Sequence, residues 1–404
     1  MSTSTKRPVQ DWATDFDHTD PRWSNDPFPI WDHLRKHCPI AHSDRFEDGA
    51  FFPSRYEDVR EISYDTEHFS SRRVIVRESK VRPVVPAPPI TSDPPEHRSA
   101  RMPLLPAFNA NAIERLTPGT RALCNRLIDA FIERGSCDAA TDYAQHIPTR
   151  VIANMLGMDE EDGERYRRWI KMALEEGIRD NAKVLQSLQE MTVYFGEELA
   201  RRGATPGEDL ISFMRDQRVD GQPLAPDKLI GTLRLLLIAG IDTTWSAIGA
   251  SLWHLAQHPL DTARLVADPS LMDTAVEELL RAYAPVTMAR EVVKDVTING
   301  CPMKTGAMVL LSFPAANRDP EMFPDADKVL IERQENRHAA FGLGMHRCVG
   351  SNLARMELRV ALEEWLKRIP AFRLADSTRV KWSEGTVRGP RHLPVLFAPA
   401  PVRP

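Results

Sequence analysis

The sequence predicts a mainly α-helical protein with a minor β part, folded as a single domain over residues 1–404. Between about His97 and Ala284, apolar residues recur at the three- and four-residue spacing of amphipathic helices. Strand character is confined to the first part of the chain, residues 290–314 and the tail. No Gly/Ser tract, long charge run or internal repeat divides the chain, so one large domain is favoured.

One predicted helix should cross the middle of the molecule. The stretch between Pro226 and Pro259 contains no proline and is apolar nearly all round at its centre, which predicts a buried helix. Two further helices are expected, one that ends before Pro285 and one after Gly350. Residues 72–95 hold six prolines, which exclude helix and central strand. A loop of this length in a compact domain is typical of a lid over a site.

The composition narrows the function classes. The net charge of -5 gives no sign of nucleic-acid binding, and 42% hydrophobic residues are ordinary for a globular protein. The N-terminus is polar and has no signal-peptide core. No uncharged apolar run approaches the roughly 18 residues of a membrane span. We therefore expect a cytoplasmic protein that binds neither nucleic acid nor a membrane.

One cysteine stands in an unusual setting. The five cysteines form no CxxC pair and no cluster, so neither a disulfide framework nor a zinc site is indicated. Cys348, however, lies in the glycine-rich stretch HAAFGLGMHRCVG and directly precedes a predicted helix. A helix N-terminus lowers the pKa of a nearby thiol and favours the thiolate. A single thiolate ligand suits an iron whose other ligands come from a porphyrin.

The same stretch resembles the haem-binding loop of cytochrome P450 enzymes. The pattern F-G-x-G-x-H-x-C-x-G is met in full by Phe341, Gly342, Gly344, His346, Cys348 and Gly350. The resemblance covers essentially the whole chain and is closest to the soluble bacterial branch. It implies the cytochrome P450 fold, with a long central helix over a buried haem b. It also implies that Cys348 ligates the iron and that Phe341, Gly342, His346 and Gly350 contact the cofactor.

Two further motifs follow the family order. Glu278 and Arg281 form the E-x-x-R pair on one helix face. By the resemblance they join Arg333 in a structural lock behind the haem. Considered alone, such a pair is usually an ordinary solvated helix face.

The third motif lies in the buried helix between Pro226 and Pro259, where an acid and an alcohol are costly to bury unless they have a function. The resemblance makes Asp242 and Thr243 the catalytic pair that delivers protons during O2 activation. In the alternative, Thr243 bonds back to its preceding turn and Asp242 is paired.

The resemblance implies further cofactor contacts and partners. Small Ala239 and Gly240 leave room for O2. The haem propionates need cationic or hydrogen-bonding partners, for which the sequence offers His97, Arg101, Arg290 and His338. Electrons should come from a ferredoxin served by an NAD(P)H-dependent reductase. It would dock on the Cys348 side of the haem, where Arg347 and Arg355 can meet an acidic surface.

The implied activity is that of a monooxygenase. One oxygen atom from O2 enters a small, mostly hydrophobic substrate, by hydroxylation or oxidative demethylation, and a terpenoid-like molecule is slightly favoured. The alternatives are a small aromatic acid as substrate, a peroxide-driven peroxygenase, a haem enzyme that works without O2, and a non-catalytic haem sensor. Besides the 72–92 loop and the segment 165–200, the expected pocket residues are Leu235, Ile238, Ala239, Thr243, Val286, Thr287, Met288, Thr386 and Val387.

A basic segment at the start of the predicted lid offers a second interpretation of the pocket. It carries Arg72, Arg73, Arg77, Lys80 and Arg82. Such a run is usually a solvated loop face, but one of these side chains could anchor a substrate carboxylate.

Overall fold

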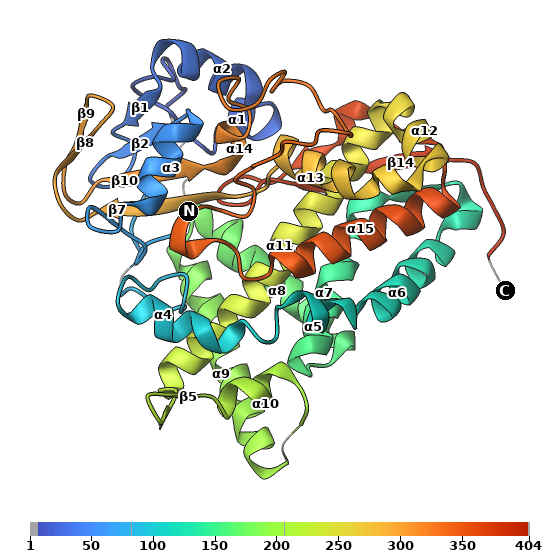
Figure 1. The fold of residues 1–404 in the computed structure, drawn as a ribbon, viewed down its shortest axis with the longest axis horizontal. Helices are drawn as coiled ribbons and strands as arrows, with labels where there is room; N and C mark the ends of the chain where they lie inside the picture. The colour runs from blue at the N-terminus through green and yellow to red at the C-terminus, as the bar shows by residue number, and fades with distance from the viewer. Residues whose placement is uncertain (1–6, 82, 206, 403–404) are drawn as a thin grey trace.

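The computed structural model describes residues 7–81, 83–205 and 207–402. Helices fill most of the molecule, and the N-terminal strands form a sheet at one side (Figure 1). The longer helices in the described part are α2 Phe28–His37, α3 Tyr56–Tyr64, α6 Thr117–Asp129, α7 His146–Leu156, α8 Gly163–Leu174, α9 Asn181–Ala204, α11 Pro226–Gln257, α12 Pro259–Ala267, α13 Met272–Ala282 and α15 Ser351–Arg368. The shorter ones are α1 Pro21–Asn25, α4 Glu96–Arg101, α5 Ala110–Glu114, α10 Leu210–Arg215 and α14 Phe313–Ala316.

The main sheet joins distant parts of the chain. Its strands lie in the order β1 Ile40–Ser43, β2 Ala50–Pro53, β10 Met308–Ser312, β7 Thr287–Val292 and β3 Phe69–Ser70. β10 runs parallel to β2 and antiparallel to β7. A second sheet has the order β11 Phe372–Leu374, β14 Pro394–Phe397 and β4 Ser136–Asp138. Two-stranded pairs are β5 Arg218–Val219 with β6 Gln222–Pro223, β8 Val296–Ile298 with β9 Cys301–Met303, and β12 Lys381–Trp382 with β13 Pro390–His392.

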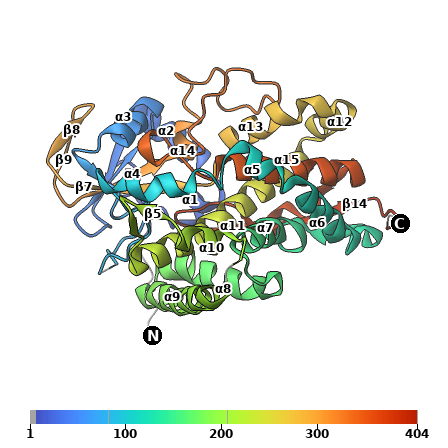
Figure 2. The same cartoon turned by 60° about the horizontal axis from the view of Figure 1, so that its bottom comes forward.

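Helix α11 is the centre of the helical part. It packs against α7, α9 and α15, and Figure 2 shows α8 and α9 as a layer beneath it. By length and composition alone α11 could cross a membrane, but 67% of its apolar window is buried within the fold. Its apolar surface is therefore used for internal packing, as the sequence predicts.

The proline-rich segment lies directly on α11. No described residue between 72 and 95 belongs to a helix or a strand, and Arg82 lies outside the described residues. A Cβ atom at Gly231 of α11 would come within 2.5 Å of the Pro86 carbonyl oxygen. The loop therefore approaches the helix as closely as a glycine allows, where a lid would be expected.

The predicted elements are found with shifted boundaries. The helical pattern from 111 to 135 divides between α5 and α6, because Pro118 has no N–H to continue a helix and instead starts the new one. Helix α15 begins at Ser351, so Cys348 precedes it by three residues rather than one. The mainly α architecture with a minor β part is confirmed. Described segments near the two ends meet, because Arg388 donates to the Ser24 carbonyl oxygen at 2.7 Å, and the single domain over 1–404 stays a prediction.

Candidate functional site

Two adjoining cavities lie along α11. The first, called the cysteine cavity, has about 1400 Å³ of empty space, part of it open to solvent. Nine predicted cofactor residues and the predicted catalytic residue Thr243 line it; the nine are Arg101, Ala239, Gly240, Arg290, Phe341, Gly342, His346, Cys348 and Gly350. These residues come from α4, α11, β7 and the glycine-rich stretch. The structure thus brings together groups that are up to about 250 positions apart in the chain.

The glycine-rich stretch folds back on itself and presents Cys348 to the cavity. The Cys348 N–H donates to the Phe341 carbonyl oxygen at 2.7 Å, which closes the loop. Gly344 has a φ of +67°, and a Cβ there would come within 2.5 Å of the Ser63 carbonyl oxygen of α3. Only glycine satisfies both the positive φ and this close approach. Cys348 lines the cavity, and its thiol is thereby available to a group bound there.

The pKa of Cys348 differs from the sequence-based expectation. Enclosure by protein raises its pKa above the ordinary thiol value, although the Gly350 N–H and Arg101 oppose this effect. The expected lowering by the helix N-terminus was wrong, because α15 starts three residues later and desolvation is the larger effect. A bound cation would supply the missing stabilisation, since a coordinating thiol is deprotonated by its metal.

Glu278 and Arg281 form a fully buried pair that also holds Arg333. Arg281 donates to both carboxylate oxygens of Glu278 at 2.8 Å, and Arg333 Nε donates to Oε2 at 3.0 Å. The Leu330 N–H donates to Oε1 at 2.8 Å and the Asn336 amide to Oε2 at 3.1 Å. Burial raises the pKa of Glu278, but Arg281 and the other donors outweigh it and leave that pKa below its ordinary value.

The remaining donors of Arg281 bind the segment that leads to Cys348. They reach the carbonyl oxygens of Asn317 at 2.8 Å, Ala326 at 2.9 Å and Lys328 at 2.6 Å. This segment has no helix or strand, so it relies on these bonds for its path. The geometry is that of the expected lock.

Asp242 is buried in α11 and tied to the C-terminal part of the chain. Its Oδ1 accepts from Arg391 Nη2 at 2.6 Å, whereas Oδ2 has no hydrogen-bond partner among the described residues. Arg391 also donates to Glu175 at 2.5 Å and to the Ser246 hydroxyl at 2.9 Å. Burial raises the pKa of Asp242 to about 6, although Arg391 opposes the rise. The carboxyl group can therefore take up and release a proton near neutral pH.

Thr243 and Ala239 lie where the two cavities meet. Both line the cysteine cavity and the neighbouring one. The Thr243 hydroxyl donates to the Ala239 carbonyl oxygen at 2.8 Å, which is the back-bond of the alternative interpretation. Its oxygen keeps accepting capacity toward the cavity. Close packing is a second reason for a glycine at position 240, because a Cβ there would lie 2.9 Å from Ile152 Cγ1 of α7.

A cluster of cationic and imidazole groups stands at one side of the cysteine cavity. His97 and His346 contact each other with ring centroids 4.5 Å apart, and His97 Nε2 is buried without a partner. Burial, Arg290 and His97 lower the pKa of His346 to about 3. Arg290 is buried, and within the described part of the protein its guanidinium donates to the neighbouring Ala289 carbonyl oxygen at 2.8 Å. The cluster thus retains donors for an anionic group.

His338 does not belong to this cluster, and its prediction as a propionate partner is corrected. Its Nε2 lies 3.1 Å from Glu277, and its Nδ1 accepts from the Ala340 N–H at 3.2 Å. Both ring nitrogens are committed, and the residue lines a surface hollow rather than the cysteine cavity. Its place in the cluster is taken by His346, a member of the same sequence motif.

The residues of the cysteine cavity fit haem b. The donor set combines one thiol that faces the space with two arginines and two imidazoles at its side. Among the described residues His97 Nε2 has no hydrogen-bond partner, and Cys348 lines the cavity with a free thiol; a metal porphyrin with two carboxylates offers a partner to each. Cys348 would hold the iron, and Arg101, Arg290, His97 and His346 would hold the propionates.

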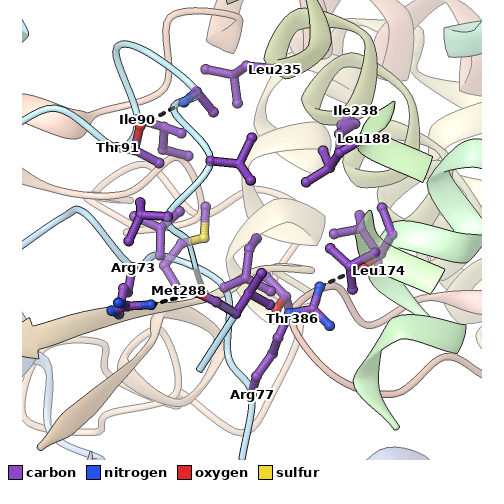
Figure 3. A pocket seen from close by; sticks show the side chains of 18 of the residues that line it. Arg73, Arg77, Ile90, Thr91, Leu174, Leu188, Leu235, Ile238, Met288 and Thr386 are labelled. Carbon is purple, nitrogen blue, oxygen red and sulfur yellow. Dashed lines mark hydrogen bonds between the residues drawn. The ribbon is translucent and has the colours of Figure 1, made fainter. Parts of the chain in front are cut away.

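The second cavity, called the loop cavity, lies between the 72–95 loop and α11. Eight of the nine predicted pocket residues line it, namely Leu235, Ile238, Ala239, Thr243, Val286, Met288, Thr386 and Val387. Ala173 and Leu174 of α8 and Val184 and Leu188 of α9 add the expected wall from 165–200. Figure 3 shows the mostly apolar side chains that converge on this space. Thr287 is the exception, because its hydroxyl turns to Ser312 at 3.4 Å.

Sequence reasoning missed a buried acid, Glu357 of α15. The side chain is fully buried. Burial raises its pKa to about 8, although the hydroxyl of Thr244 on α11 opposes the rise. The signal in the sequence is a carboxylate at an apolar-periodic position between Met356 and Val360. Arg391 was missed too, and nothing in its local sequence marks it.

Glu357 generates a prediction about stability and pH. Because its pKa is raised on folding, the unfolded chain releases this proton first, and stability falls between pH 4.5 and about 8. Glu357→Gln removes the effect. We expect the free energy of unfolding of Glu357→Gln, measured by urea unfolding, to exceed that of the parent by an amount that grows across this pH range to several kcal/mol. The matched control is Glu363→Gln on the same helix, whose partner Arg121 lies 2.6 Å away. A constant difference between Glu357→Gln and the parent at all pH values contradicts the assignment.

Comparison with known proteins now identifies the family. The family model Cytochrome P450 matches residues 166–381. Mycinamicin IV hydroxylase/epoxidase of Micromonospora griseorubida is 35% identical over 356 residues, which cover 86% of this chain and 89% of that protein. Steroid C26-monooxygenase of Mycolicibacterium smegmatis is 33% identical over 368 residues, which cover 89% and 90%. The structure of cytochrome P450 CYP109Q5 from Chondromyces apiculatus superposes with a TM-score of 0.86 at 33% identity, covering 96% and 100%. The chain belongs to the cytochrome P450 family and is a haem-containing monooxygenase.

Proposed function

We propose that this monooxygenase oxidises a compact, largely hydrophobic molecule bound in the loop cavity, by hydroxylation or oxidative demethylation. One observation carries the proposal: the loop cavity adjoins the cysteine cavity, and Ala239 and Thr243 line both. A molecule in the loop cavity therefore reaches the space that Cys348 faces. The walls are mainly aliphatic, which suits an apolar body.

The bound haem supplies O2 activation and C–H oxidation, which no amino-acid side chain provides. In the overall reaction a C–H bond of the substrate becomes C–OH, and the second oxygen atom leaves as water. Two electrons from NAD(P)H and two protons reduce that second oxygen atom to water. The chain must therefore position the substrate, exclude bulk water and deliver protons.

Asp242 and Thr243 are the groups suited to deliver those protons. With a pKa of about 6, Asp242 is mostly ionised at neutral pH yet readily protonated. Its unpartnered Oδ2 is free to accept a proton while Arg391 holds Oδ1. Thr243 stands next in the helix at the meeting point of the cavities. This pair favours an O2-dependent enzyme over a peroxide-driven peroxygenase, an O2-independent haem enzyme or a haem sensor.

The substrate class is the finer part of the proposal. A terpenoid-like molecule suits the aliphatic walls. The names of the relatives, a mycinamicin hydroxylase and a steroid monooxygenase among them, show that the shared scaffold serves very different molecules. The scaffold thus does not select among them, and the lining of the loop cavity must do so.

We further propose that a ferredoxin docks on the Cys348 side, with the electrons coming from an NAD(P)H-dependent reductase. Arg347 is exposed there and shares a surface hollow with Arg337. Arg355 contributes less than expected, because it donates to both carboxylate oxygens of Glu277 at 2.6 and 2.7 Å. Its charge is already neutralised, so Arg347 is the stronger contact. A cytoplasmic location, where such a partner is found, belongs to the same proposal.

The proton-delivery role predicts the behaviour of Asp242→Asn. Amide replacement keeps the size but cannot shuttle a proton, so NAD(P)H-driven product formation should fall by about 100-fold. Hydrogen peroxide already carries both protons and electrons, so peroxide-driven product formation should change little. Product would be measured under both regimes, with Asp216→Asn, whose carboxylate is exposed, as the control. Equal losses under both regimes contradict proton delivery, and faster turnover of the parent with peroxide alone favours the peroxygenase.

The docking proposal predicts that Arg347→Glu lowers ferredoxin-driven turnover by about tenfold at low salt, with the difference shrinking as salt rises. Arg218→Glu, an equally exposed arginine on β5, is the matched control. Turnover with a small chemical reductant should be unaffected. Unchanged ferredoxin-driven turnover in Arg347→Glu excludes this surface.

A further inference from the structure

The loop cavity has a charge distribution that its apolar walls do not suggest. Five cationic residues line it, Arg72, Arg73, Arg77, Lys80 and Arg234, and no acidic residue of the described chain does. Three of the five have a carboxylate partner elsewhere. Arg73 and Lys80 reach Glu291 at 3.3 and 3.2 Å, and Arg72 reaches Asp93 at 3.6 Å.

Arg77 is different, because it is buried without a carboxylate. Its guanidinium donates to the carbonyl oxygens of Gly177 and of Ala173, the latter at 2.7 Å. These carbonyls lie at the end of α8, where the helix dipole contributes only about half a charge. Figure 3 shows Arg77 reaching from the loop to this end of the cavity, close to Thr386. Two of its five N–H groups are used by these bonds, which leaves three.

Arg234 of α11 is a second buried cation of the same kind. It donates to the Thr192 hydroxyl at 2.8 Å and to the Pro86 carbonyl oxygen at 3.0 Å, and both acceptors are neutral. Its Nε is buried and has no partner within the described structure. Desolvation is the one cause that lowers the pKa of either arginine, so no acidic group near them compensates the charge.

Two full positive charges in an aliphatic wall are costly without an anion. We propose that the anion is supplied by the substrate, which is an apolar molecule carrying a carboxylate that Arg77 or Arg234 binds. The planar guanidinium matches a carboxylate through two parallel N–H donors, and the unused donors of either arginine can provide them. The Thr386 hydroxyl lines the same space and adds a neutral donor. This inference rests on the proposed monooxygenase function and specifies its substrate class.

The same geometry sets the position of oxidation. Arg77 and Arg234 line the loop cavity but not the cysteine cavity, whereas Ala239 and Thr243 line both. A carboxylate held by either arginine therefore directs the apolar body toward Thr243. The carbon that receives oxygen should lie at the end of the molecule remote from the carboxylate.

The test compares acids with neutral molecules of nearly the same shape. Binding of 4-isopropylbenzoate and perillate to the haem-loaded protein would be measured by calorimetry at neutral pH, each against its own primary amide. We expect the acid to bind at least about tenfold more tightly, equivalent to about 1.4 kcal/mol. The preference should be lost in Arg77→Gln/Arg234→Gln and partly kept in Arg77→Lys. Arg72→Gln, with an exposed side chain, is the matched control.

The outcomes separate this inference from the function on which it rests. Equal affinity for acid and amide in the parent protein, no binding of either acid at millimolar concentration, or an acid preference that survives the double substitution overturns the carboxylate site. The first two outcomes are measured on the parent protein alone. The carboxylate site can therefore be tested even if a variant fails to fold. Failure of the monooxygenase function would show instead as a protein that takes up no haem, or as loaded protein that forms no oxidised product from any bound ligand.

Discussion

The buried carboxylate of Glu278 is the interaction on which the rest of the site depends. It accepts hydrogen bonds from Arg281, Arg333, Asn336 and the Leu330 backbone, and Arg281 extends the network to three carbonyl oxygens. These bonds fix an irregular segment that has no secondary structure of its own. The glycine-rich loop continues from this segment, so the position of the Cys348 sulfur depends on the path of the segment. A buried ion pair is weak as a source of net stability, but removal of one partner costs about 3–5 kcal/mol.

Helix α11 faces this loop and divides the chemistry between two cavities. Its apolar surface fills the core, whereas Ala239 and Thr243 remain at the junction of the cysteine and loop cavities. Asp242 is connected away from the cavities, through Arg391 to Glu175 at the end of α8. Arg234, two turns earlier, faces the loop cavity. One helix thus carries the proposed proton-delivering pair Asp242 and Thr243, the latter at the cavity junction, and a cationic group two turns earlier, and its rigidity keeps their spacing fixed.

Local sequence was sufficient where the chemistry is contiguous. The cysteine loop and the Glu278–Arg281 pair are set by short-range geometry, and the structure brings their side chains to the expected places. Thr243 bonds back to Ala239 and Asp242 is paired with Arg391, so their catalytic role stays a proposal. The predictions were wrong where a partner distant in the sequence determines the orientation of a side chain. His338 and Arg355 were predicted to face the cofactor and a protein partner, but Glu277, which is adjacent to Glu278, takes both. The roles of Arg391 and Arg234 depend on how other elements pack against α11, and no local sequence pattern predicts that packing. Glu357 was hidden because one polar residue on an apolar helix face changes the periodicity very little.

The most direct test of the central claim is whether the Glu278 network holds Cys348 in position to ligate iron. Arg281→Lys keeps the charge but loses the paired donors and the three carbonyl bonds. The measurement is the absorption band of the reduced carbon monoxide complex, which reports thiolate ligation, together with the haem content. Arg264→Lys, on the surface of α12, is the control. We predict a full thiolate band in the parent and the control, and loss of the band or of haem in Arg281→Lys. An unchanged band and haem content in Arg281→Lys would contradict the account.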